Sequence, residues 1–190
     1  MAAMKSSASA RRAFAGAFAA RGLEIIALNA NGNPTHPTEP QQAEGLRDTI
    51  RIAGELGLKT VCTMSGLPAG RPGDLMPNWV VSSWPPETRA ILDYQWNEVL
   101  IPFWAGIADL ARASGVERIA LELHGNQCVY NVPTLLRLRA AIGPIPGWLV
   151  LGLGALLLVV AVLATAWATA EIRIRRREVD RQVEKLLEDH

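Results

Sequence analysis

The sequence predicts an α/β fold in which about three β-then-α units build a parallel sheet, followed by one membrane-spanning helix. Two observations lead to this prediction. Short apolar runs alternate with stretches of helical periodicity up to Gly143, and a long uncharged block follows. Strands and helices that alternate at this spacing form right-handed βαβ units with parallel strands. We therefore divide the chain into an α/β domain, a transmembrane helix and a basic amphipathic helical tail, at residues 1–143, 144–170 and 171–190.

The composition limits the function classes that need to be considered. The 190 residues are enough for one ordinary domain and an appendage. A net charge of only +1 gives no reason to expect nucleic-acid binding. Two cysteines, Cys62 and Cys128, do not form a disulfide framework, and we expect both to be reduced, in or near a core. This favours a reducing compartment for the first part of the chain.

The N-terminus has two readings. Lys5, Arg11 and Arg12 precede the apolar stretch Ala13–Ala20, as in a secretion signal. The apolar stretch has only about eight residues, at the low end for such a signal. We therefore favour an alanine-rich amphipathic helix that leads into the first strand.

Three apolar runs predict the strands. Parallel strands covered on both faces lose the polar alternation of exposed strands, so a short continuous apolar run bounded by turn residues indicates one. The β-branched and apolar residues of each run support this, as does the breaker pair Ser65-Gly66 after the second. The predicted strands are Leu23–Asn29, Thr60–Met64 and Arg118–Leu123.

Helical periodicity predicts the segments between and after the strands. Glycines end the first two helices, at Gly57 and Gly115, as is usual at a helix C-terminus. Pro102 falls inside the second helix and should kink or split it. The predicted helices are Gln41–Leu56, Tyr94–Ser114 and Thr134–Ile142. The long loop Gly66–Glu87, rich in proline, has a length typical of functional loops.

Ligands of parallel α/β folds bind where the strands end at their carboxyl side. Polar side chains at these positions are therefore the candidate site. They are Asn29, Asn31 and His36 after the first strand, Ser65 after the second, and Glu122 and His124 at the end of the third.

Glu122 stands on an otherwise apolar strand, where a carboxylate is costly unless it is paired or bound to a metal. A carboxylate there suits a hard cation such as Mg²⁺ or Mn²⁺, and an ion pair with Arg118 or a neighbouring arginine is the equal alternative. His124 shares a strand face with Glu122, because one residue separates them. His36 lies in a proline-rich turn, where a surface role is the common one.

Two tryptophans of the long loop, Trp79 and Trp84, could cover a sugar ring. Packing of the loop onto the domain is the other reading, and the pattern alone favours it.

Several motifs in order resemble one known family. LNANGNPTHP, TMSGLP, PNWVVSSWPPE, YQW and ALELHGNQCVYN, between Arg21 and Gly143, are similar to the sugar phosphate isomerase/epimerase family with its xylose-isomerase-like TIM barrel. The resemblance implies a metal-dependent enzyme that moves a proton next to the carbonyl of a sugar or polyol. It implies Mn or Mg as the metal, with Glu122 as a metal ligand and catalytic residue. The candidate substrate-binding residues are His36, Trp79, Trp84 and His124.

The resemblance also implies that this chain is an incomplete barrel. A complete (β/α)8 barrel needs about 250 residues. In the family, later strands supply an Asp, a His and a second Glu to the metal, whereas this chain enters a hydrophobic block after Gly143. We therefore expect a partial TIM barrel with no catalysis of its own. Its two open sheet edges could pair through self-association.

The hydrophobic block predicts a membrane span. Residues 147–170 carry no charge, and about 24 residues form a helix of about 36 Å, enough to cross a bilayer core of about 30 Å. Trp148 and Trp167 stand near its ends, as interfacial anchors do. The arginines from Arg173 onward predict a cytoplasmic C-terminus. The barrel part would then lie on the outer side of the membrane, but no clear signal peptide would take it there. We therefore leave the orientation of the barrel part open.

Three functions are compatible with these patterns. The chain could be an isomerase-family protein joined to a membrane segment. It could be a membrane-tethered barrel remnant that binds a sugar or protein without catalysis. It could be a single-pass membrane protein whose working parts are the span and the basic tail, which could contact anionic lipid. We favour the first function, as a statement of descent from the isomerase family and not of activity.

Overall fold

The computed structural model describes residues 2–82 and 84–143. The predicted span at 147–170 and the predicted tail at 171–190 lie outside the described residues. Within the described part, no helix is both long and apolar enough to cross a bilayer. The span and the tail therefore stay predictions from the sequence.

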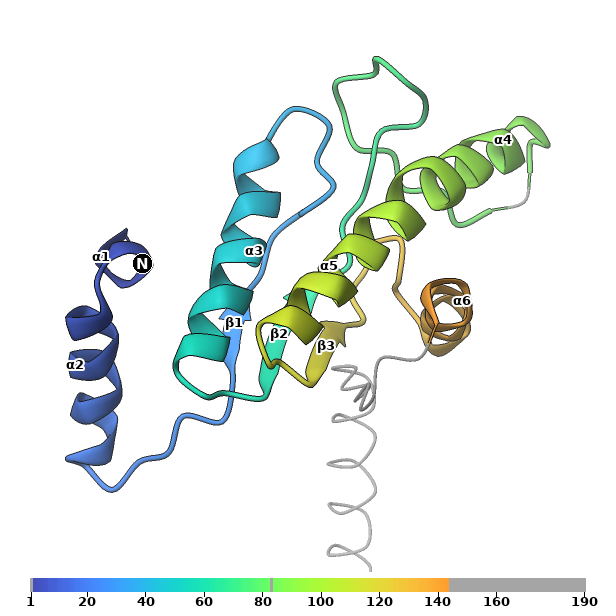
Figure 1. The fold of residues 1–190 in the computed structure, drawn as a ribbon. Helices are drawn as coiled ribbons and strands as arrows, with labels where there is room; N and C mark the ends of the chain where they lie inside the picture. The colour runs from blue at the N-terminus through green and yellow to red at the C-terminus, as the bar shows by residue number, and fades with distance from the viewer. Residues whose placement is uncertain (1, 83, 144–190) are drawn as a thin grey trace, which may run out of the picture. The chain divides into compact units, whose positions relative to one another are not determined.

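Three parallel strands form one sheet, with the second strand in the centre (Figure 1). This confirms the predicted α/β class and its parallel sheet. The strands are β1 (Leu28–Ala30), β2 (Thr60–Met64) and β3 (Arg118–Glu122).

The first strand is shorter than the predicted run, Leu23–Asn29. Leu28 already pairs with Val61, the second residue of β2, so the residues before position 27 have no partner in that strand. The side chains of Leu23 and Ile26 are 56% and 77% exposed. The prediction was wrong at this end because an apolar run does not show where the neighbouring strand begins.

Helices follow each strand, close to the predicted positions. The pair α1 (Ala2–Ser6) and α2 (Ala8–Ala19) precedes the sheet, which confirms a helix at the alanine-rich N-terminus. α3 (Pro40–Glu55) joins β1 to β2, and α6 (Val132–Ile142) follows β3. The helical region between β2 and β3 begins earlier than predicted and has three segments, α4 (Glu87–Asp93), η1 (Tyr94–Leu100) and α5 (Ile101–Ala113).

Pro102 changes the helix type, as its chemistry requires. The segment before it, η1, is a π-helix, in which the N–H of Ile101 donates to the carbonyl of Trp96, five residues back. Proline lacks an N–H, and in an α-helix its ring would collide with the carbonyl four residues earlier. The wider π turn relieves that collision. The predicted interruption therefore takes the form of a local widening.

The core lies on the face of the sheet that α3 and α5 cover (Figure 1). Side chains alternate along a strand, so Val61 and Thr63 of β2 and Ile119 and Leu121 of β3 point to this face and are buried. They pack against one hydrophobic cluster. Its helix and loop members include Leu46, Ile50, Ala53, Leu67, Trp96, Leu100, Trp104, Ile107, Val129, Leu135 and Leu138.

The opposite face of the sheet, here called the second face, carries different residues. The register places Asn29 of β1 beside Cys62 of β2, and Cys62 beside Ala120 of β3. Two residues nearer the carboxyl ends of the strands, Met64 pairs with Glu122. In a closed barrel this face would line the interior.

Hydrogen bonds tie the loop after β2 to the loop after β3. The Ser65 hydroxyl accepts from the N–H of Val129 at 2.9 Å, and the side-chain carbonyl of Gln127 accepts from the N–H of Gly66 at 2.6 Å. The N–H of Cys128 donates to the carbonyl of Gly66 at 2.9 Å. The two loops therefore form one connected layer at the carboxyl ends of the strands.

Candidate functional site

Glu122 lies at the carboxyl end of β3, on the second face of the sheet. It is the last residue of the strand, it pairs with Met64 of β2, and its side chain is half-buried. Ile119 and Leu121 take the opposite side and fill the core. The alternation of β3 thus directs the one carboxylate of this strand away from the helices, to the position where ligands of α/β barrels bind.

Asn31, from the end of β1, holds this carboxylate. Its Nδ2 donates to Glu122 Oε2 at 3.3 Å, although 91 residues separate them. Arg118, the alternative partner from sequence, lies four residues earlier, about 13 Å along the strand. Its Nε donates to Thr60 Oγ1 at 3.0 Å instead. Of the two readings of Glu122, the ion pair with Arg118 is therefore not the arrangement in the structure.

Cys62 lies on the second face together with Glu122. It stands two residues before Met64, the residue of β2 that pairs with Glu122. Burial raises the pKa of the Cys62 thiol, and the negative charge of Glu122 raises it further. The thiol is therefore neutral near pH 7. Cys62 and Cys128 form no disulfide in the described part of the chain, and their reduced state stays a prediction.

The histidines make contacts within their own loops. His36 Nδ1 accepts from the N–H of Thr38 at 3.3 Å, and its Nε2 lies 3.8 Å from Glu39 Oε1. The exposed His124 has its Nδ1 2.6 Å from the carbonyl of Gly125. Because β3 ends at Glu122, the strand alternation that predicted a shared face does not reach His124. Their roles in substrate binding stay predictions.

The two tryptophans of the long loop have different surroundings. The indole N–H of Trp79 donates to the carbonyl of Gln127 at 3.1 Å, and its ring meets Tyr130 edge to face at 5.8 Å. This contact packs the loop onto the segment after β3. Trp84 is 77% exposed, and its backbone N–H donates to Ser82 Oγ at 3.2 Å.

The described residues do not by themselves fit a divalent metal. Mg²⁺ and Mn²⁺ prefer several oxygen ligands arranged around the ion. Glu122 offers a carboxylate and Asn31 an amide, but the described part of the chain contains no group of three acidic, histidine or cysteine side chains that could hold an ion. A metal at this edge would need ligands beyond the described residues.

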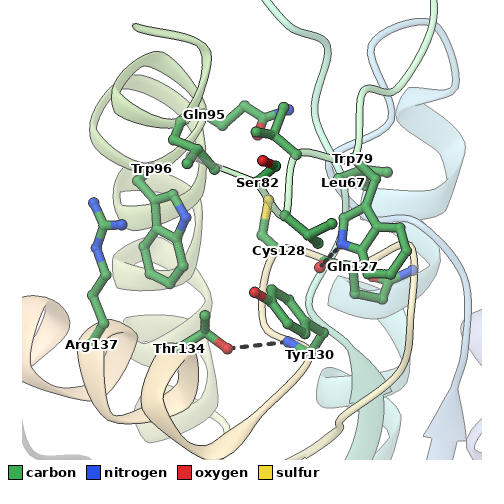
Figure 2. A pocket seen from close by; sticks show the side chains of 13 residues that line it. Leu67, Trp79, Ser82, Gln95, Trp96, Gln127, Cys128, Tyr130, Thr134 and Arg137 are labelled. Carbon is green, nitrogen blue, oxygen red and sulfur yellow. Dashed lines mark hydrogen bonds between the residues drawn. The ribbon is translucent and has the colours of Figure 1, made fainter. Parts of the chain in front are cut away.

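A cavity of about 260 Å³ lies beside this edge, between the long loop, η1, the loop after β3 and α6 (Figure 2). The reasoning from strand ends missed three of its wall residues, Trp96, Tyr130 and Arg137, because they lie on helices or further into a loop. Arg137 places its guanidinium 4.0 Å from the centre of the Trp96 ring. The wall also includes Leu67, Trp79, Ser82, Leu92, Gln95, Gln127, Cys128 and Thr134.

Comparisons with known proteins found one curated relative and several solved structures of similar fold. A protein of Bacillus subtilis (strain 168) called uncharacterized protein YfiH is 47% identical over 143 residues, which cover 72% of this chain and 45% of that protein. A solved xylose isomerase domain protein from Planctomyces limnophilus matches with a TM-score of 0.47 and 10% identity, over 77% of this chain and 49% of that one. The IolI protein, solved with a bound zinc atom, matches with a TM-score of 0.45 and 14% identity, over 76% of this chain and 46% of that one.

This chain spans about half the length of each of these proteins. The model of the xylose isomerase-like TIM barrel family matches residues 2–151. That match covers the sheet, its helices and both strand-end loops. The chain therefore belongs to the xylose isomerase-like TIM barrel family.

Proposed function

We propose that this chain carries part of the substrate site of a sugar or polyol isomerase or epimerase, with Glu122 as the carboxylate that contacts the substrate. The observation that supports it is the place of Glu122, at the carboxyl end of β3 on the second face, with Asn31 donating to it from the end of β1. Substrates of (β/α)8 enzymes bind at this edge. The family of the chain supports the same class of reaction.

The chemistry gives each residue a role. Isomerisation or epimerisation moves a proton at a carbon next to a carbonyl, and a base must stand within hydrogen-bond reach of that proton. Asn31 donates to one carboxylate oxygen, Oε2, and so fixes the plane of the group. No described residue donates to the other oxygen, Oε1, which can therefore meet a substrate hydroxyl or a cation.

Turnover needs more than this pair. A single carboxylate does not both hold a divalent ion, which takes about six ligands, and move protons at two substrate carbons. We propose Mn or Mg as the ion, held by Glu122 together with ligands beyond the described residues. The described residues alone are expected to bind a sugar without isomerising it.

Binding can be tested on the full chain by titrating the ¹⁵N-labelled protein with a panel of aldoses, ketoses and cyclic polyols. We expect one class to shift the side-chain amide signal of Asn31 in NMR spectra. Glu122→Gln should weaken that binding about tenfold or more, because it removes a charge-assisted hydrogen bond.

The matched control is Glu117→Gln. Glu117 is exposed just before β3 and pairs with Lys59 at 3.1 Å, at the other end of the strand from Glu122. It should leave sugar binding unchanged. If no sugar or polyol moves the Asn31 signal, or if Glu122→Gln binds as tightly as the parent chain, the proposal is wrong.

The membrane reading is a separate proposal. A bilayer contact through residues 147–170, with a cytoplasmic C-terminus, has the uncharged block and the following arginines as its support. A tethered, non-catalytic binding module would use the same Asn31–Glu122 pair, so the sugar titration serves both readings.

A further inference from the structure

The cavity beside the strand ends contains a buried donor with no partner among the described residues. Trp96 is 2% exposed, and its indole N–H points into the cavity (Figure 2). The indoles of Trp79 and Trp104, by contrast, donate to backbone carbonyls at 3.1 and 2.9 Å. A buried indole N–H nearly always finds an acceptor, since leaving it unpaired costs about 1–3 kcal/mol. The N–H of Trp96 therefore indicates an acceptor that the described residues do not supply.

A second donor faces the same space. The hydroxyl of Tyr130 points into the cavity, and no described residue bonds to it (Figure 2). Its ring and the ring of Trp79 form an aromatic wall. Two donors set among aromatic and aliphatic side chains suit a small molecule with an apolar body and an acceptor group at one end.

The charges of the wall favour a negative ligand. Arg137 is the one ionised side chain among the wall residues, and no acidic side chain of the described chain forms an ion pair with it. Burial raises the pKa of the Cys128 thiol to about 12, so this neighbour is neutral. Thr134, in the first turn of α6, also lies in the wall, and the N-terminal end of a helix favours an anion.

From these contacts we infer that the cavity binds a small organic monocarboxylate, with its carboxylate at the Trp96 and Tyr130 donors and its apolar body against the aromatic wall. A volume of about 260 Å³ accommodates a molecule of the size of benzoate. Neither Asn31 nor Glu122 belongs to the wall, so this site is distinct from the Asn31–Glu122 pair, although it includes Trp79, a candidate substrate-binding residue. Either proposal can fail without the other.

Benzoate serves as the probe, and the indole N–H signal of Trp96 in the ¹⁵N-labelled full chain as the readout. Trp96→Phe assigns that signal by removing it. Benzoate should shift the Trp96 indole N–H more than the indole signals of the five other tryptophans. Benzamide, of the same shape but neutral, should bind at least about tenfold more weakly because the charge-assisted hydrogen bonds are lost.

Two matched pairs of variants locate the site. Arg137→Gln and Tyr130→Phe should each weaken benzoate binding about fivefold to tenfold. Arg139→Gln, an exposed residue two positions further along α6, and Tyr94→Phe, which lies outside the cavity wall, should leave the affinity unchanged. Arg137 is exposed apart from its contact with the Trp96 ring, so its substitution removes the positive charge and that contact.

Three results would overturn the inference. The first is the absence of a benzoate-dependent shift at Trp96, which would mean that the N–H meets only water. The second is equal binding of benzamide and benzoate. The third is equal loss of affinity in Arg137→Gln and Arg139→Gln, which would show a general charge effect.

Discussion

At the scale of single residues, the charge of Glu122 acts on Cys62 across the second face of the sheet. Glu122 sits beyond the thiol toward the strand ends, and its charge contributes to the raised pKa of Cys62. A raised thiol pKa means less thiolate at a given pH, and only the thiolate reacts with alkylating agents. The reactivity of Cys62 therefore depends on the charge that Glu122 places beside it.

We predict that Glu122→Gln speeds the alkylation of Cys62 by iodoacetamide at pH 8 severalfold. Removing the carboxylate charge lowers the pKa of the thiol, so the thiolate fraction rises, although burial keeps it below that of a free cysteine. Peptide mapping by mass spectrometry gives the rate at each site. Cys128 is the internal control, because with a pKa of about 12 it should stay unreacted in both proteins. An unchanged rate at Cys62 would contradict the electrostatic effect of Glu122 on the thiol.

The sequence could predict Glu122 but not its partner. A carboxylate at the end of an apolar strand is visible in the pattern, because burial makes it costly. Asn31, a candidate by position, could be joined to Glu122 only once the sheet order was known, since 91 residues separate them. Trp96 stands in the YQW motif, but neither it nor Arg137 was a candidate site residue, because a tryptophan or arginine on a helix is common and only packing places them around one cavity.

At the scale of elements, α3 packs closely on the end of α5 at one glycine. A Cβ at Gly54 would lie 2.1 Å from the carbonyl oxygen of Ser114, which is backbone and cannot rotate away. A Cβ at Gly45, in the same helix, would have nothing within 4 Å. Gly54 therefore allows α3 to approach the end of α5 closely. Gly45 allows no such contact and only costs backbone entropy on folding.

We predict that Gly54→Ala lowers the free energy of unfolding by about 2 kcal/mol or more, because α3 must move away from Ser114. Gly45→Ala should raise it by about 0.5–1 kcal/mol, because alanine is the better helix former. Urea denaturation of both variants and the parent measures the difference. If both substitutions stabilise the chain, the contact between α3 and the end of α5 is wrong.

Element positions were predicted well where they depend on local chemistry. β2, bounded by turn residues, was predicted at its observed limits, and α3 was predicted to within one residue at each end. β1 was predicted too long because its length is set by the pairing with β2. Pro102 predicted a kink or a split, whereas the structure accommodates it with a π turn.

At the scale of the whole described sheet, β2 has two neighbours while β1 and β3 have one each. Unpaired backbone groups on an edge strand favour pairing with another chain. We predict that the sedimentation coefficient of the full chain rises with concentration, and that Asn29→Lys on β1 suppresses the rise, because lysine on an edge strand opposes pairing.

Gln41→Lys is the control for this prediction. Gln41 is exposed on α3, away from the sheet, and its substitution adds the same charge. It should leave the association unchanged. A single sedimenting species at every concentration would contradict the prediction, and equal suppression by both lysines would assign the effect to net charge.

The π turn of η1 has a consequence for how relatives should be compared. An extra residue taken up in one helical turn leaves the helix beyond it in its old orientation, so α5 can keep its packing while Trp96 turns to a new direction. Deleting one residue between Tyr94 and Leu100 would restore an ordinary α-helical turn and rotate Trp96 relative to Trp104. A one-residue alignment gap here should therefore mark family members that keep the barrel but lack the cavity.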